Sequence, residues 1–251
     1  APFVNTTFDT SPTLSSPRES IPHVEKIFGP GNRYVTRAKQ LVSTEAVAVD
    51  LPAGPSEVMV LADNSARAEF VAADLLSQAE HGDDSQAILV CRTERFARQV
   101  TRAVEEQIRY LSRGEAIRNS LANSRIVLFD EEYKQIAFAN AYAPEHLIVS
   151  MRDAWGIAAK ITAAGSVFIG NYSPESAGDY ASGTNHTLPT GGWARACSGV
   201  NVDSFMRKIT FQELTRDGLD ALAPAITAMA EAEGLDAHAN AVRVRMKGGI
   251  L

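Results

Sequence analysis

The sequence is poor in cysteine, and the two cysteines it has lie far apart. Among 251 residues only Cys91 and Cys197 carry a thiol, which supports neither a disulfide scaffold nor a cysteine zinc site. Cys91 closes the apolar run AILVC and is predicted to be a buried strand residue. Cys197 stands in WARACSG with no histidine near it in sequence, so a reactive thiol is not favoured there.

Long apolar runs and blocks of positive charge are also lacking. No apolar stretch approaches the roughly 18 residues that cross a bilayer, and the start, APFVNTTFDTSP, lacks the basic-then-apolar order of a secretory signal. Lys and Arg number 24 against 30 Asp and Glu, whereas a nucleic-acid binder needs a basic face. We therefore expect a cytoplasmic protein with a small-molecule partner, no nucleic acid and no membrane.

Apolar residues make up 45% of the chain, enough for one large domain or two small ones. Residues 1–20, rich in Ser, Thr and Pro, are predicted to be an irregular lead. After them, short apolar runs alternate with segments of helical period. The predicted strands are residues 47–50, 58–62, 87–91, 125–129, 146–150 and 166–170. The predicted helices are residues 34–43, 65–81, 93–111, 131–139, 154–163 and 219–230.

This alternation predicts an α/β fold, in which helices cover both faces of a parallel sheet. We expect the α/β catalytic domain to span residues 21–210 and a C-terminal helical tail to span 211–251. Asp63 or Asn64 is expected to cap the helix that begins near Ser65. Ligands of such sheets bind beyond the carboxyl ends of the strands, so the polar segments are expected to meet there.

Four polar segments are candidates for a ligand site. The last of them is uncommonly long for a segment without helical or strand period, which favours a function. They are LPAGPSE with Ser56, the helix end with Gln78 and His81, AYAPEHLIV with Glu145 and His146, and GNYSPESAGDYASGTNHTLPTGG with Asp179 and His186.

Gln78 and His81 are three residues apart, so on a helix they lie on one face and could bind one ion together. The same spacing also occurs at a solvated helix end. A zinc site needs three or four ligands and accepts imidazole nitrogen and carboxylate oxygen. Spacing alone does not choose the others, for which Asp179, His146, His186 and His238 are the candidates.

The pair Glu145 and His146 precedes a predicted strand. Adjacent residues in an extended segment point to opposite sides and need not share a partner, and Pro144 favours extended geometry for the residue before it. A carboxylate and an imidazole there could divide proton transfer, one deprotonating a hydroxyl and the other a water. A turn with a buried histidine explains the pattern equally well.

Six segments, in their order and spacing, resemble the histidinol dehydrogenase family from about Glu19 to the C-terminus. They are KIFGPGNRYVTRAK, VDLPAGPSEVMVLAD, DLLSQAEHGDDSQAILV, NAYAPEHLIV, GNYSPESAGDYASGTNHTLPTGG and EGLDAHANAV. The resemblance implies an incomplete Rossmann-like parallel sheet and one zinc ion per active site. It also implies the last steps of histidine biosynthesis, in which L-histidinol is oxidised through L-histidinal to L-histidine with two NAD⁺.

The resemblance also assigns roles by motif. His146 would remove the hydroxyl proton and Glu145 would activate the water that attacks the aldehyde, while His186 is assigned to loop structure. The implied zinc ligands are Gln78, His81, Asp179 and His238, and these bind substrate together with Ser56, Glu145, His146 and Glu233.

Two further expectations follow from the resemblance. The tail with Glu233 and His238 would reach a neighbouring subunit, giving a homodimer with shared active sites. Family members have a long portion ahead of KIFGPGN that has no match here, so only Asn32 corresponds to an NAD contact, and sheet edges are expected to be exposed. The alternatives are a zinc-binding subunit or fragment deficient in NAD binding, or a relative that oxidises another polar alcohol.

Overall fold

The computed structural model describes residues 24–29, 33–45 and 47–246. The chain divides into two compact units, Ala1–Phe205 and Met206–Leu251. The predicted lead at residues 1–20 lies outside the described residues. Within the described ranges, no helix is long and apolar enough to cross a membrane.

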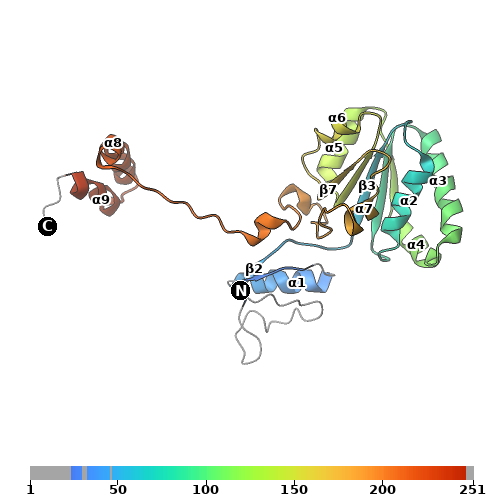
Figure 1. Ribbon diagram of the computed structural model, residues 1–251, viewed down its shortest axis with the longest axis horizontal. Helices are drawn as coiled ribbons and strands as arrows, with labels where there is room; N and C mark the ends of the chain where they lie inside the picture. The colour runs from blue at the N-terminus through green and yellow to red at the C-terminus, as the bar shows by residue number, and fades with distance from the viewer. Residues whose placement is uncertain (1–23, 30–32, 46, 247–251) are drawn as a thin grey trace, which may run out of the picture. The chain divides into compact units, whose positions relative to one another are not determined.

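A five-stranded parallel sheet forms the centre of the first unit (Figure 1). Its strands are β3 (Glu57–Ala62), β4 (Gln86–Cys91), β5 (Arg125–Leu128), β6 (His146–Ser150) and β7 (Ser166–Ile169), in the spatial order β5-β4-β3-β6-β7. All neighbouring pairs run parallel. The predicted α/β class and its parallel sheet are confirmed.

Helices cover both faces of this sheet because the central strands are nearly continuous apolar runs, whose successive side chains point to opposite faces. They are α2 (Ala68–Ala79), α3 (Glu94–Gln107), α4 (Gly114–Leu121), α5 (Glu132–Tyr142), α6 (Ala154–Ala158) and α7 (Glu175–Tyr180).

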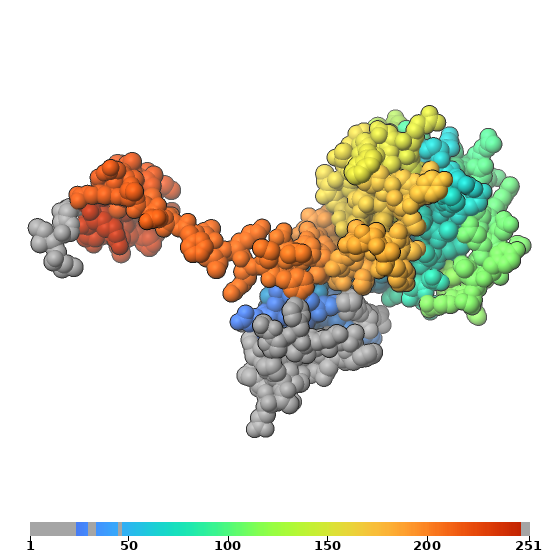
Figure 2. Space-filling model, viewed as in Figure 1, coloured from blue at the N-terminus to red at the C-terminus, as the bar shows by residue number. Residues whose placement is uncertain are grey.

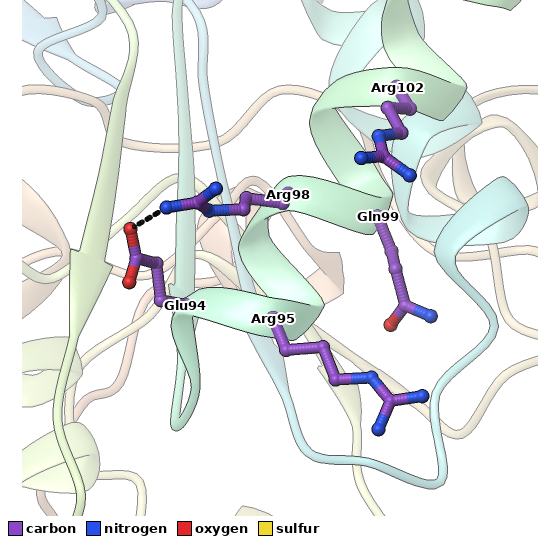
Figure 3. A pocket seen from close by; sticks show the side chains of 5 residues that line it. All are labelled: Glu94, Arg95, Arg98, Gln99 and Arg102. Carbon is purple, nitrogen blue, oxygen red and sulfur yellow. Dashed lines mark hydrogen bonds and ion pairs between the residues drawn. The ribbon is translucent and has the colours of Figure 1, made fainter.

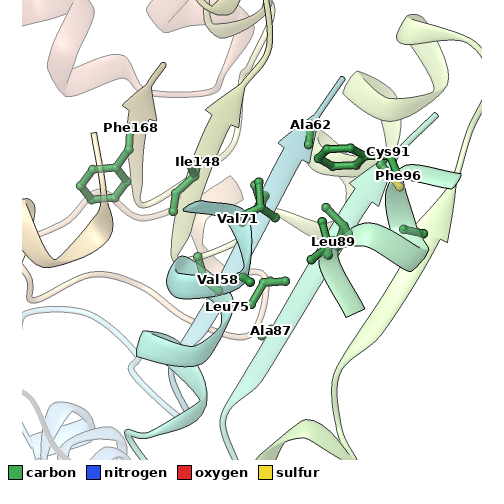
Figure 4. Close-up of a cluster of buried hydrophobic side chains, with 14 residues drawn as sticks. Val58, Ala62, Val71, Leu75, Ala87, Leu89, Cys91, Phe96, Ile148 and Phe168 are labelled. Carbon is green, nitrogen blue, oxygen red and sulfur yellow. The ribbon is translucent and has the colours of Figure 1, made fainter. Parts of the chain in front are cut away.

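The two faces have separate apolar cores. On one face, Val58 and Leu89 pack with Val71 of α2 and Phe96 of α3 (Figure 4). Cys91 is fully buried in that cluster, as predicted. On the other face, residues such as Met59 of β3 pack with α5 and α6. Burying each such side chain contributes about 1.5–3 kcal/mol.

The helix α4 was not predicted from the sequence. Its segment, GEAIRNSL, is only eight residues long and has three apolar residues, Ala116, Ile117 and Leu121, too few for a firm prediction. Ile117 is nevertheless fully buried against Leu76, Ala79 and Ile108, and Leu121 packs against the same cluster. Tertiary packing therefore stabilises a helix that is too short to be stable alone.

The predicted cap of α2 is wrong. The helix begins at Ala68, later than expected, and the residue at its N-cap is Arg67. The carboxylate of Asp63 instead accepts hydrogen bonds from the backbone N–H of Ser65 (2.8 Å) and of Arg152 (3.1 Å). Asp63 thus ties the end of β3 to the segment after β6.

The outer strand β5 is incompletely covered. Its side chains Ile126 and Leu128 are each 46% exposed, and they lie in register with Leu89 and Cys91 on the face that carries α2 and α3. The expectation of an exposed sheet edge is confirmed at this strand.

A small two-stranded sheet precedes the large one. It consists of β1 (Lys26–Ile27) and β2 (Ala48–Val49), joined through α1 (Arg33–Val42) and the turn η2 (Ser43–Glu45). The ammonium of Lys39 lies 2.6 Å from the carboxylate of Asp50, and the two side chains are 7% and 1% exposed. Lys39 also donates to the carbonyl of Gly29, whose N–H donates to Asp50 (2.8 Å).

The second unit contains α8 (Arg216–Ala232) and α9 (Asp236–Met246). The predicted helix 219–230 lies inside α8. The two helices bury Ala230, Ala239 and Val242, whereas Leu222, Met229 and Leu235 stay 40–66% exposed. Whether this apolar surface forms a dimer contact remains a prediction.

We expect Lys39→Met to destabilise the first unit by about 3 kcal/mol, because it leaves the Asp50 charge buried without its partner. Urea unfolding followed by circular dichroism measures the loss. Lys160→Met is the control, since its pair with Glu132 is 57% and 41% exposed and contributes about 0–1 kcal/mol. The double variant Lys39→Met/Asp50→Leu should recover much of the loss, and no recovery would contradict the charge argument.

Candidate active site at the amino ends of the strands

The polar segments meet at the amino ends of the strands. Ser56 immediately precedes β3, Glu145 immediately precedes β6, and Gln78 and His81 lie at the end of α2, just before β4. The prediction of a site beyond the carboxyl ends is therefore wrong. The reason is the connection itself, because a helix that follows a parallel strand returns the chain to the amino edge.

The segment after β7 folds back over this edge. Within the predicted structureless loop, the short helix α7 packs against α2 (Figure 1), and Figure 2 shows the segment at the surface beside α2. Gly178 lets α7 lie close to Phe168 of β7, since a Cβ at this position would lie 2.6 Å from the Phe168 ring. Glu175 and Asp179, four residues apart on α7, thereby reach the site.

His81, Glu175 and Asp179 form a possible metal site. One ligand atom from each lies within 4.8 Å of the others, and Glu175 is buried while His81 is exposed. His81 follows Glu80, the C-cap residue of α2, rather than lying in the helix, and its N–H donates to the carbonyl of Gln78. Glu175 was missed by the sequence reasoning. The sequence feature that could have pointed to Glu175 is its spacing of four residues from Asp179. This spacing places the two side chains together only if the segment is helical.

Several buried polar atoms at this edge have no hydrogen-bond partner among the described residues. They are the amide oxygen and nitrogen of Gln78, Oε2 of Glu175, Nε2 of His146 and Oε2 of Glu57. Each such group costs about 1–3 kcal/mol. The donors fit zinc, which takes imidazole nitrogen and carboxylate oxygen, and a bound cation with a polar ligand would satisfy them.

The main chain of Glu57 holds both residues of the Glu145–His146 pair. Its N–H donates to Oε2 of Glu145 (2.9 Å), and its carbonyl lies 3.2 Å from Nδ1 of His146. The two neighbours need not share a partner, yet both contact Glu57, one through its N–H and the other through its carbonyl. Because a carbonyl only accepts, Nδ1 carries the hydrogen, and the lone pair of Nε2 is left free to take a proton.

Ala143 departs from the geometry expected before a proline. It is left-handed, with φ 56° and ψ 63°, and its N–H donates to the carbonyl of Ala139 (2.8 Å) as the C-cap of α5. The prediction of extended backbone before Pro144 is therefore wrong. Proline excludes the right-handed region, and the helix end selects the left-handed one.

Burial dominates the ionisation of the site. It raises the pKa of Glu175 to about 9, helped by the nearby carboxylates of Asp179, Glu145 and Asp74. Burial also raises the pKa of Glu145 to about 8 and lowers the pKa of His146 to about 4. At neutral pH the two glutamates thus keep their protons and the imidazole is neutral. A cation would shift both carboxyls towards the charged form.

The remaining predicted site residues are spread along the chain. Asn32 is outside the described residues. Glu233 and His238 belong to the second unit, on either side of the turn between α8 and α9, and both are exposed. In the first unit, the hydroxyl of Ser56 hydrogen-bonds Glu145, while His186 is exposed in the loop.

A separate hollow of about 450 Å³ lies on the outer face of α3. Figure 3 shows its lining, in which Arg98 pairs with Glu94 at 2.7 Å. The other lining residues are Arg95, Gln99 and Arg102. All five side chains belong to α3 and are exposed to solvent. The site at the amino ends of the strands takes no residue from this helix.

The fold and site together define an α/β protein with proton-transfer groups beside a possible metal site. The family model for histidinol dehydrogenase matches residues 13–246. The chain belongs to the histidinol dehydrogenase family, as the sequence motifs predicted.

Relatives support this membership over most of the chain. A histidinol dehydrogenase of Bacteroides fragilis (strain YCH46) is 61% identical over 229 residues, which cover 91% of this chain and 54% of the relative. The corresponding enzyme of Legionella pneumophila (strain Lens) is 53% identical over 230 residues. The crystal structure of histidinol dehydrogenase from Elizabethkingia anophelis matches with a TM-score of 0.90 and 55% identity, over 93% of this chain and 54% of that one. The chain spans about half the length of these relatives.

We expect the metal-free protein to lose stability as the pH rises from 6.5 to 9. Folding raises the pKa of Glu145 and Glu175 from 4.5, so the folded chain binds protons that the unfolded chain has released, and stability falls with pH. His146 has the opposite sign, but its effect fades within about one pH unit above its ordinary pKa of 6.5, so the two glutamates dominate. Urea midpoints in a chelator should show this fall, smaller in Glu175→Gln and unchanged in the exposed control Glu80→Gln. An equal fall in Glu175→Gln would contradict the assignment.

We expect Gly165→Ala to disturb the site through the backbone. A Cβ at Gly165 would lie 2.5 Å from the carbonyl oxygen of Glu145 and 3.1 Å from Cβ of Leu188, so the start of β6 must shift. The expected loss is about 1–3 kcal/mol in urea unfolding. Gly218→Ala in α8, whose added methyl meets only side-chain atoms at 3.2 Å or more, should not destabilise the chain. Equal effects of the two changes would refute this reading.

Proposed function

We propose that this chain carries the zinc-binding and proton-transfer residues of a histidinol dehydrogenase. The reaction is the oxidation of L-histidinol through L-histidinal to L-histidine with two NAD⁺, in the cytoplasmic biosynthesis of histidine. The observation that carries the proposal is the neutral His146, whose unpartnered Nε2 is buried beside Glu145 and a possible metal site.

His146 acts first, as the base of the alcohol oxidation. Its Nδ1–H is engaged by the Glu57 carbonyl, so Nε2 accepts the proton of the substrate hydroxyl while hydride leaves the same carbon for NAD⁺. Because burial keeps the pKa of His146 at about 4, the imidazole is in the proton-accepting form at neutral pH.

Glu145 acts in the aldehyde oxidation. Its Oε2 is fixed by the N–H of Glu57 (2.9 Å). In the charged form, which a bound cation would favour, Glu145 takes a proton from the water that adds to the aldehyde carbon. The hydrated aldehyde then gives hydride to the second NAD⁺ and becomes the carboxylate of histidine. The hydroxyl of Ser56 hydrogen-bonds Glu145 and lies where it can bind substrate.

Zinc would be held by Gln78, His81, Asp179 and His238. When bound, it would supply positive charge and orient the substrate through its amine and imidazole nitrogens. Glu233 would bind the substrate with His238, and Asn32 would contact NAD⁺. Both Glu233 and His238 come from the second unit, so we propose a homodimer in which each site takes these two residues from the neighbouring subunit. Support for the metal assignment comes from the unpartnered amide of Gln78.

The proposal predicts NADH formation from L-histidinol by the zinc-loaded chain, measured by absorbance and abolished by a chelator. His81→Asn should lower zinc content and activity together, because a ligand is lost. Glu145→Gln should keep zinc, and should reduce the conversion of L-histidinal about 10²–10⁴-fold, because the base of the second step is lost.

The exposed His186→Ala is the control and should change neither zinc content nor rate strongly. If Glu145→Gln loses zinc to the same extent as His81→Asn, the division of roles is wrong. If zinc-loaded chain forms no NADH at any NAD⁺ concentration, the proposed activity of this chain is refuted.

A further inference from the structure

Residues 187–200, which we call the covering segment, lie against the starts of β3 and β6. Leu188 and Thr190 of this segment are 5% and 3% exposed, so it packs against the protein rather than extending into solvent. Leu188 lies beside the main chain of Glu145, since a Cβ built on Gly165 would meet both. The proposed reaction gives no part to any residue of the covering segment.

Two side-chain hydrogen bonds hold the covering segment to the chain around the start of β3. Oγ1 of Thr190 accepts the N–H of Gly54 (2.5 Å), and Oε1 of Glu57 accepts the N–H of Gly191 (2.9 Å). Gly191 and Gly192 are left-handed, with φ 60° and 78°, a conformation that glycine adopts without steric cost. These two glycines make the tight turn in which the N–H of Gly191 meets the carboxyl group.

Glu57 joins the covering segment to the proposed catalytic pair. Its side chain binds Gly191. Its N–H donates to Oε2 of Glu145 (2.9 Å), and its carbonyl lies 3.2 Å from Nδ1 of His146. A shift of the covering segment that moves residue 57 is therefore transmitted to both members of the pair.

The carboxyl group of Glu57 is held in place at a cost in stability. Burial raises its pKa, and the hydrogen bond from the N–H of Gly191 opposes that rise. Its other oxygen, Oε2, is buried without a hydrogen-bond partner in the part of the chain that the structure describes, which carries a desolvation penalty. An unsatisfied group of this kind calls for a role beyond folding stability, and the contact with the covering segment supplies one.

We propose that Glu57 is a positioning residue, whose carboxyl group fixes the covering segment over Glu145 and His146 and thereby holds the main chain that contacts them. The inference rests on the proposed function for the reaction that this pair performs. Displacement of a reacting group by about 1 Å costs up to about 100-fold in rate, so a side chain that touches no reacting atom can still control turnover.

The test uses the full chain and two measurements. Amide hydrogen exchange, resolved by residue, reports the N–H groups of residues 57 and 191, and NADH formation by the zinc-loaded chain gives kcat and KM for L-histidinol. The variants are Glu57→Ala, which removes the acceptor, and Glu57→Gln, whose amide oxygen can accept the same N–H. Thr190→Val releases the covering segment without changing Glu57, so it tests the same coupling if Glu57→Ala does not fold. Glu69→Ala, at a glutamate whose side chain is 65% exposed on α2, is the matched control.

We expect Glu57→Ala to accelerate exchange at residues 57 and 191 together, by about tenfold or more, because a hydrogen bond that closes the segment is lost. Its kcat should fall about 10–100-fold with a smaller change in KM, and its zinc content should stay the same. Thr190→Val should change exchange and kcat in the same directions. Glu57→Gln should stay within about threefold of the unchanged chain in both measurements, and Glu69→Ala should match it.

Three results would overturn the proposal. The first is a Glu57→Gln variant as impaired as Glu57→Ala, since the hydrogen bond would then not be the cause. The second is faster exchange at residue 191 with undiminished protection at residue 57, and the third is faster exchange at both with normal turnover. An unchanged chain that forms no NADH refutes the proposed function, whereas the joint exchange of residues 57 and 191 still decides whether Glu57 fixes the covering segment.

Discussion

The pairing of β3 with β6 is the constraint on which the site depends. These strands are distant in sequence, and their parallel register places Val58 opposite His146, so that the peptide groups of Glu57 meet the side chains of Glu145 and His146. Main-chain groups hold an acid and a base more rigidly than flexible side chains would. The side chain of Glu57 extends the same restraint, since its Oε1 accepts the N–H of Gly191 (2.9 Å) in the segment that covers the site.

The site is held together at a cost in stability. Burial opposes charge on Glu145, Glu175 and His146 alike. Two of their side-chain atoms, Oε2 of Glu175 and Nε2 of His146, have no hydrogen-bond partner among the described residues. The apolar clusters on both faces of the sheet offset this cost, because β3 and β6 are almost completely buried between them. The polar groups without partners thus lie at the amino ends of the buried strands β3 and β6. A ligand can satisfy them there without moving the backbone.

The sequence predicted the class of fold and most elements because their apolar periods are strong. It missed α4, which is held by the packing of Ile117, and α7, whose residues have little helical period but pack through Gly178 onto Phe168. Both depend on tertiary contacts that periodicity cannot report. The motifs predicted Gln78, His81, Glu145 and Asp179 as site residues, and that assignment stays a prediction. They did not point to Glu175, because its nearness to these residues depends on where α7 lies.

The edge of the sheet at which the site lies follows from charge. Helices that follow parallel strands present their N-termini at the carboxyl edge, where partial positive charge favours anions, and their C-termini at the amino edge, where partial negative charge favours cations. At the carboxyl edge this protein supplies its own anions: Asp63 accepts from the N–H groups of Ser65 and Arg152, and Asp153 caps α6. At the amino edge, the end of α2 brings Gln78 and His81 to buried carboxyls that pair with no Lys or Arg within the described residues. The rule that favours carboxyl edges rests on anionic ligands such as phosphate, and a site built for a cation has the opposite electrostatic preference.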